Sequence, residues 1–377
     1  MHLLMLTATI LLFSTGTPVV SHDIQAGMSG KPEAEDALDG LDPVLLVGGK
    51  EVPGKSSISV TRGGFVYLFS TPETKATFEG DPTKYEIQLG GVCARMGKTA
   101  GGNPSDFIVH EGKIYVFGSD DCHKKFQANP AKYLPPPAQP LPFSAAAAAE
   151  GQKLVERALS AMGGAANVDA LTSYIESMTQ VQNRPQGEVT VTTKTMWSFP
   201  DRVRQERSMA LQGKTMTSAT VLTPQGMWFL AGQGQVYPMR AASRPSLEQD
   251  FGRNPVALLR GRTSRAFTPV SIGKATVDDV AVEHLRIVNG QIDVTLALDP
   301  SGRIHSATYQ DRNNDGEYGT FVITYSDFRQ VGGLQLPHST KATFNGQPYA
   351  AQTAILDAIA INTPLDPSLF APTQVSR

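Results

Sequence analysis

The sequence predicts an α+β protein: a small duplicated α+β module, followed by a curved antiparallel sheet, a half-barrel, wrapped on an N-terminal helix. Three observations predict it. The first third of the chain repeats itself at an offset of 48 residues, a proline-rich stretch follows, and the remainder holds one strong helix signal and then many strand signals. The predicted boundaries are a leader at 1–26, a disordered segment at 27–37, the duplicated module at 38–134, a linker at 135–146 and the half-barrel domain at 147–372.

The N-terminal residues predict a cleaved secretory leader. Met1–Phe13 is almost wholly apolar, and Ser14, Gly16 and Pro18 then interrupt it. This stretch is shorter than the ~20 apolar residues of a membrane span and is typical of the hydrophobic core of a signal peptide. No other stretch of the sequence approaches the length of a membrane span. We therefore expect an exported protein, in a bacterial periplasm or secreted.

Composition and motifs exclude several classes of function. The chain has 33 Lys+Arg against 35 Asp+Glu, which argues against nucleic acid as a partner because phosphate neutralisation needs clustered cations. Two cysteines are too few for a disulfide-dense scaffold or a four-thiolate metal site. The sequence lacks the Gly-x-Ser-x-Gly, His-Glu-x-x-His and phosphate-loop motifs, so we expect no enzyme and no catalytic residues. Asp311–Gly316 begins like a calcium loop, but Val322 replaces the twelfth-position Glu and favours a polar hairpin turn.

The repeat explains the first part of the chain. Asp42–Tyr85 matches Gly90–Tyr133 without a gap. Identical pairs include Gly64/Gly112, Tyr67/Tyr115, Phe69/Phe117, Phe78/Phe126 and Pro82/Pro130. In each copy, a predicted hairpin leads into a short helix, at Pro72–Glu79 in the first copy and Asp120–Ala128 in the second.

The second copy, "GGVCARM" followed by "IVHEGKIYVFGSDDCHKKFQANPAKYL", resembles a YHS domain. The first copy, with "LDGLDPVLLVGGKEV" and "VYLFSTPETKATFEGDPTKY", is similar to the same family. The resemblance covers about Leu38–Leu134, and the Phe-x-x-x-Pro-x-Lys-Tyr ending is its most specific part. It implies that Cys93 and Cys122 stand where metal-binding relatives carry thiolates.

The two cysteines occur together in one copy and are absent together from the other, where Leu45 and Thr74 take their places. This pattern suggests that Cys93 and Cys122 act as a unit, and we predict that their side chains lie close together. Three interpretations are open: a disulfide, a soft-metal site, or a buried pair of free thiols. The metal would be copper or zinc, held by both cysteines with His123 or His110.

A second domain follows the linker. The prolines of 135–142 indicate a stiff spacer, and about Ala146–Met162 predicts a helix with one apolar face, ending at two glycines. From Ser173 to about Ile361 the pattern is of strands separated by Pro, Gly, Asn and Asp turns. Ser246–Arg260 interrupts them and predicts a helical insertion.

The strand pattern favours a hollow sheet. In Glu188–Trp197 both faces are partly apolar, which fits a sheet with solvent outside and an apolar concavity inside, although a sandwich with a solid core fits as well. A sheet of so many strands must curl, and one helix has too little surface to fill it. We therefore predict an apolar ligand pocket with Trp197, Phe199, Trp228 and Phe229 in its wall.

The pair "MWSFPDRVRQE" and "VLTPQGMWFL", with the closing "YSDFRQVGGLQLPHSTKATFNG", is similar to LolA and LolB, the periplasmic lipoprotein carrier and its acceptor, and to their wider family. The similarity spans about Glu150–Pro372. It implies a half-barrel that accepts acyl chains, with a lipid, another amphiphile or a lipoprotein as partner. Phe199 stands where the carrier has the arginine that holds its lid closed, so the resemblance does not extend to a lid-gated cycle. The sequence indicates no particular protein partner.

Overall fold

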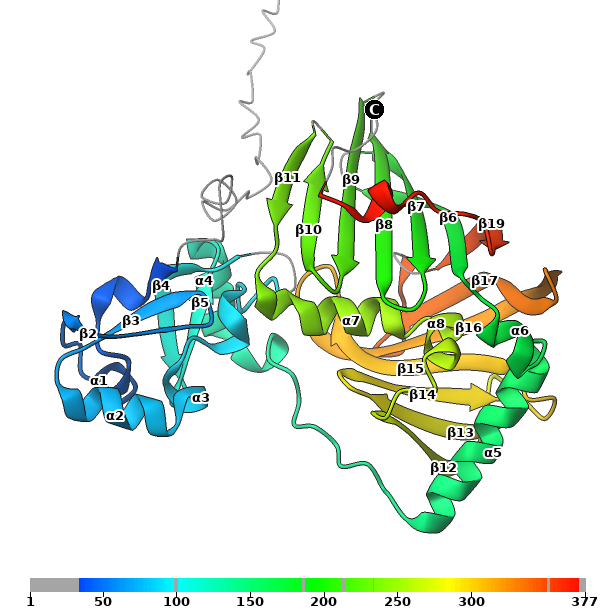
Figure 1. The fold of residues 1–377 in the computed structure, drawn as a ribbon, viewed down its shortest axis with the longest axis horizontal. Helices are drawn as coiled ribbons and strands as arrows, with labels where there is room; N and C mark the ends of the chain where they lie inside the picture. The colour runs from blue at the N-terminus through cyan, green and yellow to red at the C-terminus, as the bar shows by residue number, and fades with distance from the viewer. Residues whose placement is uncertain are drawn as a thin grey trace, which may run out of the picture.

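The computed structural model describes residues 34–97, 101–184, 187–211, 214–232, 234–350 and 353–372. The predicted leader and the first part of the predicted disordered segment, up to residue 33, lie outside the described residues. Figure 1 shows a small part at the left, in blue and cyan, and a larger part built on one long sheet. No helix among the described residues has both the length and the apolar character needed to cross a membrane.

The small part contains the two predicted copies of a hairpin followed by a helix. The first copy consists of β1 (Glu35–Asp36), η2 (Leu38–Gly40), α1 (Pro43–Val47), β2 (Lys55–Arg62), β3 (Phe65–Phe69), α2 (Pro72–Gly80) and α3 (Pro82–Tyr85). The second consists of η3 (Gln88–Gly91), β4 (Asn103–His110), β5 (Lys113–Phe117), α4 (Asp120–Ala128) and η4 (Pro130–Lys132). The sequence places Glu35–Asp36 in a disordered segment, but these residues pair in parallel with β3. The neighbouring Ala37 is buried, which fixes this strand in place.

The two copies share a hydrophobic core. Phe65, Phe69 and Phe78 of the first copy pack in one cluster with Ile114 and Val116 of the second. An isolated parallel bridge between residues 87 and 114 also joins the copies. The duplicated segment therefore forms one body, because apolar side chains of both copies pack into this shared cluster.

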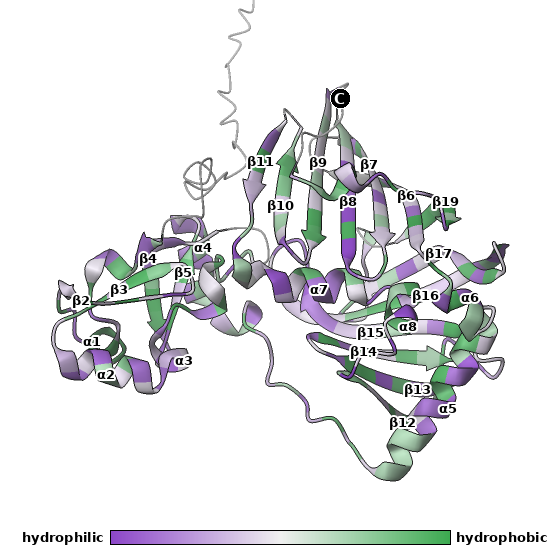
Figure 2. Cartoon of the chain, in the orientation of Figure 1, coloured by the Kyte–Doolittle hydropathy of each residue, from purple (hydrophilic) through white to green (hydrophobic). Residues whose placement is uncertain are grey.

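The linker leads to the predicted helix α5 (Ala145–Met162), which is followed by α6 (Ala165–Asp169). Ser144 caps α5 by accepting a hydrogen bond from the backbone N–H of Ala147 at 3.1 Å. Gly163 ends α5 with a φ of 120°, a conformation that favours glycine. Figure 2 shows hydrophobic and hydrophilic residues alternating along α5, as expected of a helix with one buried face. The buried face carries Leu154, Val155, Ala158, Leu159 and Met162.

One antiparallel sheet dominates the larger part. It is an open path in the order β11-β10-β9-β8-β7-β6-β19-β17-β16-β15-β14-β13-β12, with β18 beside β17. The strands are β6 (Ser173–Arg184), β7 (Gly187–Ser198), β8 (Arg202–Leu211), β9 (Lys214–Thr223), β10 (Gly226–Ala231), β11 (Gln235–Pro238), β12 (Phe267–Val277), β13 (Val280–Asn289), β14 (Ile292–Leu298), β15 (Ile304–Arg312), β16 (Tyr318–Val331), β17 (Leu334–Phe344), β18 (Gln347–Pro348) and β19 (Ala354–Ile361). The predicted polar turn joins β15 to β16. The sheet curves without closing, as Figure 1 shows, which confirms the α+β class and the open sheet.

Three helices fill much of the concave face. The predicted helical insertion forms α7 (Arg244–Gly252) and α8 (Pro255–Arg260), separated by Arg253 and by Asn254, which caps α8. Side chains of α5, α7 and α8 share one core cluster with Trp197 and with residues of the strands beyond. The prediction that a single helix occupies the concavity is therefore too simple, because α7 and α8 occupy it too.

The convex face of β8–β10 is covered by the end of the chain. The turn η7 (Pro367–Phe370) lies against these strands, and Phe370 is buried with Val221 and Leu230. Arg204 of β8 donates a hydrogen bond to the backbone oxygen of Leu369 at 2.9 Å. Apolar side chains of β9 and β10 are therefore buried on the convex face as well as on the concave one.

Candidate functional site

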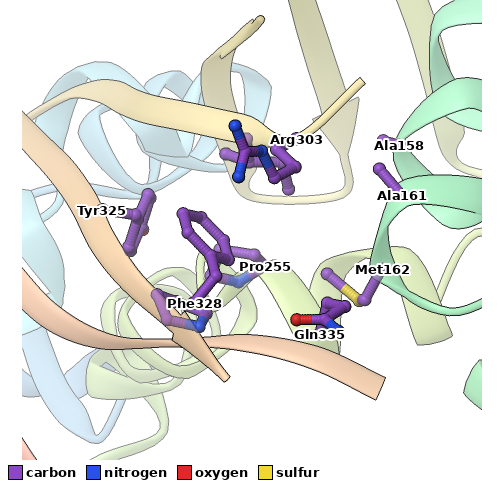
Figure 3. A pocket seen from close by; sticks show the side chains of 10 residues that line it. Ala158, Ala161, Met162, Pro255, Arg303, Tyr325, Phe328 and Gln335 are labelled. Carbon is purple, nitrogen blue, oxygen red and sulfur yellow. The ribbon is translucent and has the colours of Figure 1, made fainter. Parts of the chain in front are cut away.

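An apolar cleft lies between α5 and the sheet. Its volume is about 20 Å³, room for one or two water molecules. Figure 3 shows Ala158, Ala161 and Met162 of α5 on one side and Tyr325 and Phe328 of β16 across from them. The lining is completed by Pro255, Arg303, Ile304, Gln335 and Pro337. The cleft lies between α5 and the concave side of the sheet, where the sequence predicts a concavity.

Helix α5 is held firmly as one wall of this cleft. Gly151 lies so close to β12 that an added Cβ would sit 2.6 Å from the backbone oxygen of Pro269. At the other end, a Cβ on Gly163 would sit 2.2 Å from the backbone oxygen of Gly333. Between them, Arg157 forms an ion pair with Glu283 at 2.6 Å. The helix is therefore anchored along its length.

The opposite wall includes side chains near the surface, among them Arg303, which forms an ion pair with Asp299 at 3.1 Å. The Arg303 guanidinium lies 5.6 Å above the ring of Phe328, and the Arg303 side chain is 53% exposed. Gln335 is exposed as well. These side chains stand at the mouth of the cleft, so rotation of Phe328, Arg303 and Gln335 would enlarge it without moving α5.

A half-buried carboxyl group lies close to the cleft wall. Glu176 of β6 accepts hydrogen bonds at Oε2 from the Tyr174 hydroxyl at 2.9 Å and from the Asn254 amide at 3.1 Å. Asn254 precedes Pro255 in the cleft wall, and Tyr325 lies within electrostatic reach of Glu176. Burial raises the pKa of Glu176 to about 7, against the lowering effect of both hydrogen bonds. This group could not be predicted from the local sequence, because Asn254 and Tyr325 reach it from segments far along the chain.

Two of the predicted wall residues belong to the core beside α7. Trp197 is 5% exposed, and its indole N–H donates to the backbone oxygen of Phe251 at 3.3 Å. Phe199 packs against the same cluster, with the Arg260 guanidinium 5.7 Å above its ring. Neither residue belongs to the lining of the cleft described above.

The other two lie on opposite faces of β10. Trp228 pairs with Val221 and packs in the cluster covered by Phe370. Phe229, the next residue, faces the concave side, where it pairs with Tyr237 of β11. The thickness of the sheet separates Trp228 from the concave side, because side chains alternate along a strand. The cover provided by the C-terminal turn could not be read from the local pattern.

The side chains of the two cysteines in the second copy are in contact, as predicted. Both are free and buried, and their side chains hydrogen-bond to each other. Cys122 lies in the first turn of α4, whose cap is Ser119, and the Arg95 guanidinium hydrogen-bonds to the Cys122 sulfur.

The surroundings of the two thiols shift their pKa values in opposite directions. The hydrogen bond from Cys93 lowers the pKa of Cys122 to about 6, assisted by Ser119 and Arg95 and opposed by burial. The same hydrogen bond, together with burial, raises the pKa of Cys93 well above its ordinary value. Of the pair, Cys122 is therefore the one that ionises first.

The histidines proposed as metal ligands are engaged elsewhere. His123 Nδ1 lies 2.5 Å from Asp106 Oδ1, and the His123 ring stacks on Phe117 with centroids 4.6 Å apart. His110 packs edge-on against Phe126. Across the described ranges, no three His, Cys, Asp or Glu side chains gather in a way that could hold a metal ion. The copper or zinc site at Cys93, Cys122 and His123 stays a prediction that lacks a third ligand among these residues.

The duplicated module touches the half-barrel domain next to the cysteines. Arg312 donates hydrogen bonds to the backbone oxygens of Ala94 and Arg95 at 2.8 and 3.0 Å. Two ion pairs also cross the interface, Arg240 with Glu35 at 3.0 Å and Lys132 with Glu317 at 2.9 Å. Beside them lies a cavity of about 380 Å³ lined by Leu89, Gly90, Val92, Gly97, Ser243, Pro245, Ser246, Gln249, Asp311, Arg312 and Tyr318.

Comparison with known proteins gives structural neighbours only. No protein-family model matches the chain, and no curated protein matches it. Among solved structures, a putative outer membrane lipoprotein-sorting protein domain from Vibrio parahaemolyticus is 12% identical with a TM-score of 0.39, covering 59% of this chain and 97% of its own. A LolA superfamily protein from Nitrosomonas europaea has the same identity and coverage and a TM-score of 0.40. A DUF1329 family protein from Desulfovibrio piger is 11% identical with a TM-score of 0.36, covering 60% of this chain and 97% of its own. All three TM-scores lie below 0.5, so the description of the half-barrel stands on its strand register and helix packing.

Proposed function

We propose that the half-barrel domain binds the apolar chain of an amphiphile, such as a lipid or the acyl group of a lipoprotein, in the cleft between α5 and the sheet. The observation that carries this proposal is the lining of the cleft, in which Ala158, Met162, Tyr325 and Phe328 are apolar or aromatic. Each methylene group transferred from water into such a site gains about 0.8 kcal/mol. Eight of them would gain roughly 6 kcal/mol before the cost of ordering the chain.

Binding requires the cleft to open, because its present volume of about 20 Å³ is smaller than any acyl chain. We propose that α5 stays in place and that Phe328, Arg303 and Gln335 turn outward. The contacts support this division, since α5 is anchored at Gly151 and Gly163 while the Arg303 side chain is half exposed. An acyl chain would then extend along α5 from Ala161 toward Ala158.

The proposed protein is a non-catalytic binding protein with an accessory module. The predicted leader would place it in the periplasm or outside the cell. The duplicated module would be the accessory part, docked through Arg312 against the loop that holds Cys93. This placement leaves the cleft free, because its lining residues all belong to the larger part.

A titration of the full chain, freed of lipid, with a fluorescent fatty-acid probe tests the proposal. The Ala161→Trp substitution would fill the cleft, and we expect it to weaken probe binding by at least ~10-fold, equivalent to about 1.4 kcal/mol. Ala149→Trp is the matched control, because Ala149 lies on the same helix and is exposed away from the cleft. Equal binding by wild type and Ala161→Trp, or no binding by wild type, would contradict the proposal.

A further inference from the structure

We propose that Cys93 and Cys122 form a thiol–disulfide exchange site for a small-molecule disulfide, with Cys122 as the attacking sulfur and Cys93 as the sulfur that closes the reaction. This activity goes beyond amphiphile binding and does not depend on it, because the two sites lie in different parts of the chain. The inference rests on contact between the thiols, on their unequal access and on the cation beside one of them.

Contact and access assign the two roles. The thiols hydrogen-bond to each other, so a short movement would bring the sulfurs to bonding distance. Cys93 has no exposed surface and lies behind Gly118, where an added Cβ would sit 3.9 Å from Cys93 Sγ. Cys122 keeps 7% of its surface exposed. Only a small disulfide could reach it through so narrow an opening, and it would meet Cys122 first.

The surroundings of Cys122 favour the thiolate. The residue lies in the first turn of α4, and Cys122 N–H donates to the Ser119 hydroxyl at 3.4 Å. Unpaired N–H groups at a helix start and a nearby cation both stabilise negative charge on sulfur. Arg95 provides that cation. The thiolate is the form that attacks a disulfide.

The first repeat copy shows that the fold does not need these thiols. At the place of Cys122 it has Thr74, whose hydroxyl donates to Asp42 at 2.6 Å. Asp42 also accepts hydrogen bonds from the Ser70 hydroxyl and backbone N–H, both at 2.8 Å. A static polar network therefore holds the same hairpin and helix in the first copy. In the second copy the two thiols take the place of this network and pack in a cluster with Phe117 and Phe126.

The proposed reaction balances in two steps. The Cys122 thiolate attacks one sulfur of the incoming disulfide, forming a mixed disulfide and expelling the other half, which takes up a proton. Cys93 then loses its proton and attacks Cys122 Sγ, forming the Cys93–Cys122 disulfide and releasing the second half as a thiol. Two electrons pass from the protein thiols to the small molecule, and the two protons of the protein thiols pass to the two products by way of solvent.

The test uses the full chain and oxidised glutathione at neutral pH, with products identified by peptide mass spectrometry. We expect wild type to form the Cys93–Cys122 disulfide and Cys93→Ala to accumulate a glutathione adduct at Cys122. Cys122→Ala should form an adduct at Cys93 at least ~10-fold more slowly, since that sulfur is covered. Circular dichroism checks that each variant is folded, and the wild-type result stands without any substitution.

Several results would overturn the proposal. One is wild-type protein whose thiols stay unmodified while the same chain reacts when unfolded in urea. Another is an adduct that forms equally fast at either cysteine, which would remove the assignment of roles. A third is copper or zinc bound in equal amount by the pair and blocking the reaction, which would make the site a metal site. Probe binding at the cleft is measured separately, so failure at one site is distinguishable from failure at the other.

Discussion

Glu176 is the residue from which we predict how the stability of the half-barrel domain depends on pH. It lies on the concave side of β6, among the hydroxyl of Tyr174, the amide of Asn254 and the ring of Tyr325. None of the ion pairs found among the described residues involves it. Its pKa is raised from 4.5 to about 7, because burial penalises the charged form more than the two hydrogen bonds favour it.

This shift gives a pH dependence with a defined sign. A carboxyl whose pKa is raised on folding contributes stability below its unfolded pKa and loses that contribution as the pH rises through its folded pKa. We therefore expect the half-barrel domain to lose up to about 3 kcal/mol between pH 4.5 and pH 7 through this group. Glu176→Gln, which stays neutral, should flatten this part of the profile.

The pH dependence of stability is measured by thermal unfolding of the full chain at pH 5 and at pH 8. Unfolding is monitored by the fluorescence of the tryptophans, which both lie in the larger part. His284, whose pKa burial lowers, is present in both proteins. The difference between wild type and Glu176→Gln thus isolates the carboxyl. A wild-type profile that keeps its slope in Glu176→Gln would show that Glu176 is not the group responsible.

At the level of the elements, the local sequence pattern predicted the helices and hairpins that local contacts determine. The hairpins and helices of both repeat copies, α5 and the helical insertion all follow the expected ranges to within a few residues. The position of α7 and α8 inside the concavity was not predictable, because it depends on Asn254 meeting Glu176 across a separation of 78 residues. The covering of Trp228 by η7 is a similar long-range contact. The repeat predicted the thiol pair, whereas the local sequence predicted only one side of the cleft, the apolar face of α5 with Ala158 and Met162.

The docking of α5 can be tested at the glycine that allows it. Gly151 faces the backbone of β12, and any side chain there would collide with Pro269. We expect Gly151→Val to destabilise the domain by about 2 to 3 kcal/mol, because backbone atoms cannot move aside as a flexible side chain can. Urea unfolding measures the change in the free energy of unfolding.

The matched control for this prediction is Gln152→Val, which places the same β-branched residue on the exposed side of the same helix. It should cost only the difference in helix propensity, under ~1 kcal/mol. Equal small effects of both substitutions would contradict the close packing of α5 on β12. Helix α5 would then not be the fixed wall of the cleft.

For the whole molecule, Arg312 links the two parts. Its guanidinium holds the backbone oxygens of Ala94 and Arg95 and stacks 4.7 Å above the ring of Tyr318. We expect Arg312→Ala to raise hydrogen exchange at 92–97 by about 10-fold, equivalent to ~1.4 kcal/mol of local stability, and to leave α5 unchanged. Arg329→Ala, which removes an exposed ion pair with Asp327 within the larger part, is the control. Unchanged exchange at 92–97 would show that the two parts are held by other contacts.

Native mass spectrometry of the full chain tests amphiphile binding at the cleft most directly. The protein is purified without detergent and measured as isolated and again after incubation with an excess of a single phospholipid. We expect one bound amphiphile per chain in wild type and in Ala149→Trp, and none in Ala161→Trp. A wild-type chain that carries no amphiphile after incubation, or an Ala161→Trp chain that still carries one, would contradict it.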